Sequence, residues 1–415
     1  MATFKPFKAV RPLPKYAQKV AALPYDVMNS AEARVMVKGN PYSFLHVDKA
    51  EVDLPEGINI YTEEVYLKAR ENLDKLEAEN ICIAEKDDCF YIYRQIMNGR
   101  SQNGIVGCAA IDDYINSTIK KHELTRADKE ADRINHVDYC NANTGPIFLT
   151  YRERADISSA IEKWKNEHEP IYDFITDDGI THTIWVIDCR DTIEYIKEKL
   201  SAVDYFYIAD GHHRCASAVK VGLKRREANP EFTGNEEFNF FLAVLFPSSE
   251  LEIMDYNRVI KDLNGYTPEQ LIEKVSEKFE VTPAPVGKPY KPEKKHSFGM
   301  LLDSKWYILT AKPGSFDISD PVARLDVSIL QNNLISPVLG IDDPRTDKRI
   351  DFVGGIRGLA ELERRVNKDM ALAFSLYPTT LDDLMDIADA GKIMPPKSTW
   401  FEPKLLSGLF IHKLG

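Results

Sequence analysis

The residues best suited to chemistry in this chain lie in one short segment, Asp210-Gly-His-His-Arg214. It follows Val203–Ala209, whose aromatic and β-branched residues predict a buried strand, and a helical pattern then continues to about Arg226. A strand, a tight turn and a helix start expose backbone N–H groups at one point, where an anion binds well. Arg214 can hold phosphate oxygens with two hydrogen bonds. The segment therefore predicts a phosphate grip, in which Asp210 either caps the helix or holds a metal ion.

The alternative is an ordinary surface helix with a basic first turn. Positive charge in that turn opposes the helix dipole, so a helix without a ligand should avoid His212, His213 and Arg214 there. We therefore favour the phosphate site. Zinc is disfavoured, because adjacent histidines diverge and no Cys or His cluster at ligand spacing completes a site. We expect no metal ligated by protein residues alone.

A second group of charged residues lies between Lys120 and Arg133. Phosphoryl transfer requires positive charge on the phosphates, a metal, and a carboxylate that accepts the hydroxyl proton. This stretch supplies both signs of charge beside a hydroxyl, although the residues also fit a solvated loop in which Glu123 and Arg133 form surface ion pairs. Beyond Asp210–Arg214, we expect nucleotide contacts from His122, Thr125 and Arg133. The catalytic candidates are Glu123 in this stretch and His213 in the Asp210–Arg214 segment.

Two carboxylates near the N-terminus, Asp26 and Glu32, are candidates for the general base toward a substrate hydroxyl. Asp26 follows Pro24, which makes a stiff extended approach to a turn. Glu32 lies in a short helix that Ser30 is placed to cap. Arg34 is only two residues further on, so it cannot share a helix face with Glu32, and we expect it to contact substrate. A turn-forming role for Asp26 and a first-turn role for Glu32 remain open.

The last chemically suggestive segment is Met394–Thr399, which two prolines stiffen. A rigid loop presents its side chains at low entropic cost. We expect substrate contacts from Lys397, Ser398, Thr399 and the nearby Lys404, with a purely structural loop as the alternative.

The composition limits the classes of partner. The chain has 415 residues, enough for two domains or one enlarged domain, and a net charge of −12 that attracts no nucleic acid. The N-terminal stretch has no apolar core typical of a signal peptide, and the apolar runs are shorter than a bilayer span. The six cysteines are scattered without framework spacing, as in reduced cytoplasmic proteins. We expect a cytoplasmic protein without a nucleic-acid or membrane partner.

Periodicity predicts the elements that hold these residues. A helix from about 61 to 79 has Val65, Ala69, Leu73 and Leu76 on one face. Strands near 81–84, 89–96 and 104–111 predict an antiparallel meander. Helices are also predicted at 154–168 and 191–200, and strands at 181–187 and 238–246. Another helix begins at Thr267-Pro268-Glu269-Gln270. Nearer the C-terminus, strands are predicted at 299–302, 306–310 and 372–377, and helices at 326–335, 357–366 and 380–390.

Strands and helices mix here without regular βαβ alternation, which favours an α+β fold. A proline-rich and lysine-rich stretch, 282–296, is the best candidate for a loop or boundary. We expect a nucleotide-binding region over residues 1–250 and a C-terminal α+β region over 251–415 that packs back on the site.

Several separated segments resemble one family, the prokaryotic domain-of-unknown-function family 1015, which is grouped with the ParB/sulfiredoxin-like nucleotide-binding superfamily. The matching segments span nearly the whole chain in order. They are Pro24–Val27 with Glu32 and Arg34, Asn40–Val47, Lys121–Thr125 with Asp132 and Arg133, Gly145–Phe148, Asp178–Trp185, Asp210–Arg214, and Met394–Thr399 with Phe401, Pro403, Lys404 and Gly408.

The superfamily resemblance implies a ParB/sulfiredoxin-like core with a mixed or antiparallel sheet. Similar Asp-Gly-His-His-Arg segments occur in free serine kinases, where the loop handles nucleotide phosphates. Sulfiredoxins instead have Gly-Cys-His-Arg, whose cysteine does the chemistry. Here His212 replaces that thiol, and Cys215 points about 200° away from His213 on the helix. Sulfiredoxin chemistry is therefore disfavoured.

The resemblance implies an enzyme that interconverts free serine and O-phosphoserine with ATP or ADP and Mg²⁺. Two alternatives stay open: a phosphoserine phosphatase, and a ParB-like protein that a nucleotide switches between partners without catalysis. The expected partner is a phosphorylated small molecule, and a homodimer stays open as well. If one site does this chemistry, the first 35 residues and the segments 121–133, 210–214 and 394–404 should line one cavity.

Overall fold

The computed structural model describes residues 2–415, with the backbone alone described at Asp128. The chain forms two compact units. The first runs to Leu251 and also takes in Pro403–Gly415, whereas the second is Glu252–Glu402. The C-terminal segment therefore returns to the first unit.

The first unit is built around a nine-stranded mixed sheet. Strand β8 pairs in parallel with β12, β11 pairs in parallel with β6, and the other pairings are antiparallel. Together with the helices, this makes the fold α+β, as predicted. The strand order is β6 (Ile119–Lys120), β11 (Phe206–Asp210), β8 (Ile147–Tyr151), β12 (Phe240–Pro247), β5 (Arg100–Ala110), β4 (Phe90–Met97), β10 (Thr181–Ile187) and β9 (Tyr172–Ile175), with β1 (Phe4–Lys5) paired to β5.

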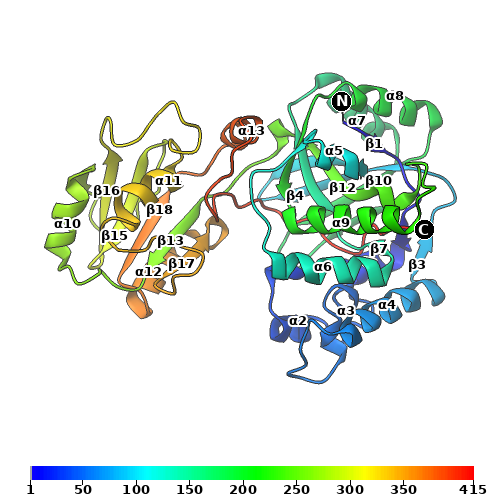
Figure 1. Cartoon of the computed structure of the whole chain (residues 1–415), viewed down its shortest axis with the longest axis horizontal. Helices are drawn as coiled ribbons and strands as arrows, with labels where there is room; N and C mark the ends of the chain where they lie inside the picture. Colours follow the sequence, from blue (N-terminus) through cyan, green and yellow to red (C-terminus); the bar gives the residue numbers. More distant parts are fainter. Residues whose placement is uncertain (1) are drawn as a thin grey trace. The chain divides into compact units, whose positions relative to one another are not determined.

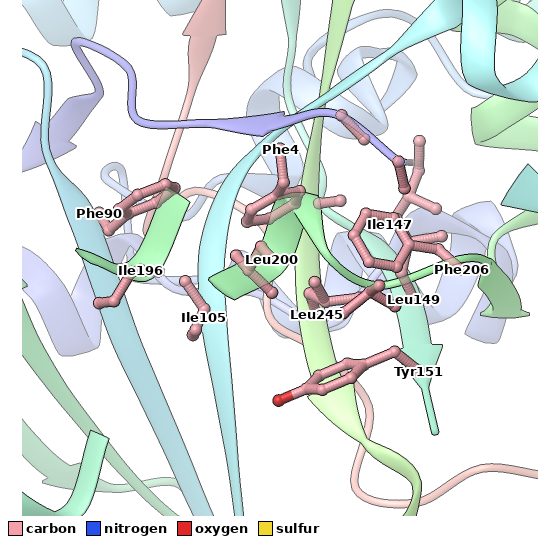
Figure 2. Close-up of a cluster of buried hydrophobic side chains, with 14 of the residues drawn as sticks. Phe4, Phe90, Ile105, Ile147, Leu149, Tyr151, Ile196, Leu200, Phe206 and Leu245 are labelled. Carbon is pink, nitrogen blue, oxygen red and sulfur yellow. The ribbon is translucent and has the colours of Figure 1, made fainter. Parts of the chain in front are cut away.

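The main core of this unit joins the sheet to the helices around it. Figure 2 shows the strand residues Phe90, Ile105 and Leu245 close to Ile196 and Leu200, which come from helix α8 (Arg190–Ser201). Each fully buried side chain of this size contributes about 1.5–3 kcal/mol. This packing holds the strands in place, and with them the residues at the ends of the strands.

Helices α6 (Ala127–Cys140) and α9 (His212–Ala228) lie side by side in the first unit (Figure 1). Helix α4 (Glu63–Ala78) packs against α6 and buries the four predicted apolar residues, which confirms its amphipathic face. The remaining helices of this unit are α1 (Ala17–Val20), α2 (Ser30–Met36), α3 (Leu45–Asp48), α5 (Ile111–Ile115) and α7 (Ala155–Glu167), with short 3₁₀ turns at 14–16, 25–27, 50–53, 237–239 and 248–250.

Three local predictions for this unit are wrong. Strand β3 (Cys82–Ala84) leaves the expected meander and pairs with β2 (Val10–Pro12), because the turn before β4 carries the chain to another sheet. Strand β11 begins at Phe206 rather than 203 and includes Asp210. Asn29, not Ser30, caps α2, since its side chain accepts a hydrogen bond from the Glu32 N–H.

The second unit contains a six-stranded antiparallel sheet. Its order is β14 (Phe279–Pro283), β16 (Lys305–Ala311), β15 (Ser297–Leu302), β18 (Leu372–Leu376), β13 (Tyr256–Ile260) and β17 (Ile350–Gly354). Its helices are α10 (Pro268–Ser276), α11 (Asp326–Leu330), α12 (Gly358–Lys368) and α13 (Leu381–Asp389), and a 3₁₀ turn spans Gly355–Arg357. The small strands β7 (Ala142–Asn143) and β19 (His412–Lys413) pair in the first unit.

Thr267 and Gln270 form the predicted capping box of α10. The predicted helix over 326–335 is α-helical only to Leu330 and continues as a π-helix over Gln331–Ile335. Of the two roles predicted for 282–296, the loop is confirmed over 284–296, which joins β14 to β15, whereas no boundary between the units lies there. Among the helices of the described residues, none has the length and apolar character that crossing a bilayer requires.

Candidate functional site

The turn between β11 and α9 has the geometry of an anion site. Gly211 takes a φ of +93°, which residues with a Cβ rarely adopt, and it caps α9 without a side-chain hydrogen bond. The first helical hydrogen bond runs from the Cys215 N–H to the Gly211 carbonyl at 2.9 Å. The N–H groups of the preceding residues therefore have no partner within the helix and can bind an anion.

The guanidinium of Arg214 lies directly beside this turn. A Cβ built on Gly211 would come within 3.2 Å of its Nε, so any other residue there would require the guanidinium to shift by a few tenths of an ångström. One terminal nitrogen donates to the Pro146 carbonyl at 2.6 Å, while the buried Nε has no partner among the described residues. Desolvation lowers the pKa of Arg214, but the carboxylates of Asp26 and Asp210 outweigh it and raise the pKa above its ordinary value.

Asp210 ends β11 and does not cap the helix, which corrects one of its two predicted roles. Its Oδ1 accepts from the Gly211 N–H at 2.8 Å, and its Oδ2 accepts from the Lys404 ammonium at 3.2 Å. Desolvation would raise the pKa of Asp210, yet Lys404 and Arg214 hold it well below its usual range. The carboxylate is thus ionised at neutral pH and links the grip to the C-terminal segment.

A small cavity brings together residues that are far apart in the sequence. The volume of the cavity is about 30 Å³. The residues that line it include Tyr25, Arg133, Gly145, Arg214 and Ser407. A cavity of this size holds a water molecule, whereas a nucleotide needs several hundred Å³. A nucleotide at this turn would therefore bind outside the cavity.

Arg133 is the second cation of this cavity. Its guanidinium lies 4.0 Å from the centre of the Tyr25 ring and is 2.8 Å from an Asp132 oxygen. Desolvation raises the pKa of Tyr25 to about 12, so its hydroxyl stays protonated. Arg133 and Arg214 therefore both contribute positive charge to the lining of the cavity.

The opposite sign of charge comes from Asp48, a buried residue that sequence reasoning missed. Its Oδ1 accepts from the Thr144 hydroxyl at 2.7 Å, and His136 lies 4.0 Å away. Desolvation and Arg133 lower the pKa of His136. Asp48 and Thr144 directly adjoin the family segments 40–47 and 145–148, which is the signal that could have revealed them.

Two neutral imidazoles, those of His122 and His212, are in contact with each other next to the turn. The rings of His122 and His212 meet edge to face at 4.5 Å, and the His122 backbone N–H donates to the His212 Nε2 at 3.5 Å. Desolvation lowers the pKa of His212 to about 4 and that of His122 well below its ordinary value. Glu123 lies 3.8 Å from His212, but at neutral pH the imidazole has no charge for an ion pair.

The arrangement can bind an anion at a strand–turn–helix junction, with Arg214 and Lys404 beside it. The described residues contain no group of three or more His, Cys, Asp and Glu placed to hold a metal ion. A comparison with family models matches residues 4–328 to the family described as "Protein of unknown function (DUF1015)". This chain belongs to the DUF1015 family.

Solved structures similar to this DUF1015 chain include a free serine kinase in complex with AMP (15% identity, TM-score 0.36, covering 72% of this chain and 86% of that chain). Others are a conserved hypothetical protein from Pyrococcus furiosus (15%, 0.35, 73% and 94%) and C-terminally truncated SbnI from Staphylococcus aureus (10%, 0.37, 72% and 85%). No curated protein matches the chain.

The DUF1015 fold gives the N-terminal candidates different surroundings. Asp26 is exposed on the 3₁₀ turn beside Tyr25. The Glu32 carboxylate instead accepts the Asn29 N–H at 2.8 Å in the capping box of α2. Arg34 donates to three backbone carbonyls, those of Glu51, Val52 and Leu54.

Other predicted nucleotide contacts have internal partners. The Arg126 N–H donates to His213 Nε2 at 3.0 Å, and the Thr125 hydroxyl donates to Glu130 at 2.6 Å. These bonds anchor the start of α6 to α9.

The loop at 394–399 belongs to the second unit. Lys397 has a φ of +61°, and its carbonyl accepts from Arg258 at 3.0 Å. The Ser398 hydroxyl donates to the Pro395 carbonyl at 2.6 Å, and Thr399 is partly exposed. Of the predicted substrate contacts, Lys404 alone lies against the grip within the first unit.

Proposed function

We propose that this chain is a phosphotransferase that moves a phosphoryl group between an adenine nucleotide and the hydroxyl of free serine. The observation that supports this most is the Gly211 turn, where Arg214 lies beside the first turn of α9, whose N–H groups precede the first hydrogen bond within the helix. Such a turn binds phosphate oxygens through backbone dipoles and a forked cation. Serine and adenine as the reactants rest on the resemblance of Asp210–Arg214 to free serine kinases.

Within this proposal, Asp210 and Lys404 are positioning residues. Their ion pair ties the end of β11 to the C-terminal segment and fixes the turn that Arg214 flanks. Arg133 adds positive charge next to Arg214 at the cavity wall. The nucleotide would lie against the exposed side of the turn, because the cavity itself holds only water-sized groups.

We propose Asp26 as the general base that accepts the serine hydroxyl proton. Asp26 is exposed, and its carboxylate is close enough to Arg214 to raise the pKa of the guanidinium. A substrate beside the guanidinium can therefore reach Asp26. Glu32 is a poorer candidate, because its carboxylate is engaged in the capping box of α2.

Magnesium would arrive with the nucleotide and neutralise charge on the transferred group. The nucleotide's phosphates would hold most of such an ion, to which proteins usually add only one or two carboxylates. Asp210 already accepts from Lys404 and Gly211, and we propose that Glu123, which is partly exposed beside the turn, provides a carboxylate.

We further propose that the sheet and α9 of the first unit form a ParB/sulfiredoxin-like core, that the protein is cytoplasmic, and that it acts without a nucleic-acid or membrane partner. Its net charge of −12 and the lack of a basic recognition helix in the sequence support the choice of an enzyme over a nucleotide-switched DNA-binding protein.

The test is a three-arm assay with purified full chain and Mg²⁺: labelled serine with ATP, phosphoserine with ADP, and phosphoserine alone. We expect label in phosphoserine in the first arm and ATP in the second. Release of phosphate in the third arm alone would identify a phosphatase. No turnover in any arm would contradict catalysis on serine.

A further inference from the structure

A buried arginine in the second unit has no acidic partner. Arg258, in strand β13, is 4% exposed, and no carboxylate of the described residues lies within 4 Å of it. Its guanidinium donates to the carbonyls of Tyr256 and Lys397, which are neutral acceptors. Desolvation lowers the pKa of Arg258 to about 10, so it remains charged at neutral pH. A buried charge without a counter-charge is costly unless a ligand supplies one.

Arg258 faces a cavity of about 330 Å³ whose residues all belong to the second unit. The walls beside it are apolar and include Phe352, Pro395 and Pro396, and the guanidinium is 5.1 Å from the centre of the Phe352 ring. The lining also carries polar and charged side chains, those of Gln331, Asp342, Asp343 and Arg345. An apolar wall together with polar groups that can orient a ligand is typical of a small-molecule site, and a volume of about 330 Å³ is near the lower end for such sites.

The same cavity has carboxylates among its lining residues. Asp343 is held by the Arg345 guanidinium at 2.8 Å. Among the described residues, the exposed Asp342 accepts one hydrogen bond, from the Ser336 hydroxyl at 2.5 Å, so lone pairs remain for another donor. The cavity therefore combines a buried cation with an accessible anion, which fits a ligand that carries both charges and repels a polyanion such as phosphate.

The backbone that holds these groups is irregular but firmly bonded. Gln331 begins the π-helix and donates through Nε2 to the Ile341 carbonyl at 2.7 Å, next to Asp342. Short π-helical segments inside α-helices occur frequently at functional sites. Here the segment anchors the loop that carries Asp342 to the wall of the cavity.

We propose that the second unit binds a small zwitterion, an α-amino acid with an apolar side chain. Arg258 binds its carboxylate, Asp342 its ammonium group, and the side chain packs on Phe352 and the two prolines. This site is separate from the anion site at Gly211 and does not depend on the phosphotransferase proposal.

The test uses isothermal titration of the full chain with four probes: L-leucine, 4-methylpentanoate without the ammonium group, 3-methylbutylamine without the carboxylate, and inorganic phosphate. We expect L-leucine to bind most tightly. Arg258→Gln should weaken L-leucine and 4-methylpentanoate about tenfold or more, the effect of a lost charge-assisted contact. Asp342→Asn should weaken L-leucine but leave 4-methylpentanoate unchanged.

Arg349→Gln is the matched control, since this arginine pairs with Asp347 and does not line the cavity. Circular dichroism verifies folding, and if Arg258→Gln fails to fold, the two probes on Asp342→Asn decide alone. No saturable L-leucine binding, equal L-leucine affinity in the wild type and Asp342→Asn, or phosphate binding that competes with L-leucine and is lost in Arg258→Gln would each overturn the proposal.

Discussion

Asp26 and Glu32 show how neighbouring carboxylates of one sequence acquire different roles. Asp26 is exposed near the Arg214 guanidinium, whereas Glu32 completes a capping box with Asn29. The same contrast applies to the two cations Arg34 and Lys404. Arg34 is saturated by three backbone carbonyls, while Lys404 pairs with Asp210 at the end of β11.

We predict that Asp26→Asn lowers turnover by about 10²–10⁴, the usual contribution of a positioned general base. Nucleotide affinity should change by less than a few fold, because the proposed phosphate contacts come from the Gly211 turn and Arg214 and not from Asp26. Glu32→Gln is the matched control, since glutamine also completes a capping box and turnover should stay near wild type. Steady-state kinetics measure both, and equal losses in the two variants would remove Asp26 from the reaction.

Arg214→Ala should weaken ADP binding by about 2 kcal/mol, the scale of a lost charge-assisted contact. Calorimetric titration measures the change. Lys224→Ala removes one positive charge from the same helix at an exposed ion pair with Asp138, so it controls for long-range electrostatics. Unchanged ADP affinity in Arg214→Ala, or the same loss in both variants, would contradict the grip.

At the scale of elements, the β11–α9 junction depends on a single backbone conformation. Gly211 adopts its positive φ where the strand ends after an irregular pairing with β8, between Ile208 and Asp210. The junction thereby turns the chain into α9 and points the first turn of the helix, with Arg214, toward the cavity.

Gly211→Ala should destabilise the fold by about 1–2 kcal/mol, because alanine pays for the left-handed conformation. It should also weaken ADP binding, since the new Cβ meets the Arg214 guanidinium. Gly234 has a similar φ of +90° with nothing within 4 Å, so Gly234→Ala should lose similar stability and keep its ADP affinity. Chemical denaturation and calorimetry separate the two effects, and matching ADP affinities in both variants would show that the turn does not position Arg214.

Two buried neutral histidines, His182 and His212, make the stability of the fold depend on pH. Desolvation lowers the pKa of both His182 and His212 to about 4, from an ordinary value of 6.5. Between these pH values the unfolded chain binds protons that the folded chain does not. The stability from these groups is therefore complete above pH 6.5 and is lost as the pH falls toward 4.

From pH 6.5 to pH 5 the loss should be about 2 kcal/mol for each of these histidines. Urea unfolding at the two pH values measures it. His182→Gln keeps a polar group between Tyr93 and Thr176 but cannot titrate, so its pH-dependent loss should be smaller by that amount. An identical loss in the variant and the wild type would contradict the assignment to His182.

At the scale of the whole molecule, the first unit is completed by the end of the chain. Strand β19 pairs with β7, and isolated bridges join Ile411 to Val10 and Ser407 to Ala22. The returning segment also brings Lys404 to the grip. The buried apolar side chains that it contributes are Leu405, Leu406, Leu409, Phe410, Ile411 and Leu414.

Truncation after Glu402 should prevent the first unit from folding stably. Six buried side chains at about 1.5 kcal/mol each contribute about 9 kcal/mol, which is comparable to the whole stability of a typical domain. Lys413→Ala is the control, because it removes only a partly exposed ion pair with Glu77 and should cost less than about 1 kcal/mol. Thermal unfolding followed by circular dichroism measures both; a truncated chain that unfolds like the wild type would contradict this role.

The sequence by itself determined the features that arise from local spacing. The apolar face of α4, the capping box at Thr267, the strand at 181–187 and the mixed α+β composition follow from period, turn residues and side-chain type, which act over a few neighbours. The Asp210–Arg214 segment was recognisable for the same reason, because strand, glycine and helix start are adjacent in the chain.

Only the tertiary structure decided which distant residues meet. Lys404 reaches Asp210 across 194 positions, Asp48 meets Thr144 across 96, and Arg258 meets the Lys397 carbonyl across 139. No periodic pattern encodes such contacts, since they depend on the order of strands in the sheets and on the return of the C-terminus. The π-helix after Leu330 is likewise a feature of the structure that was not predicted, because its local sequence suits an ordinary helix.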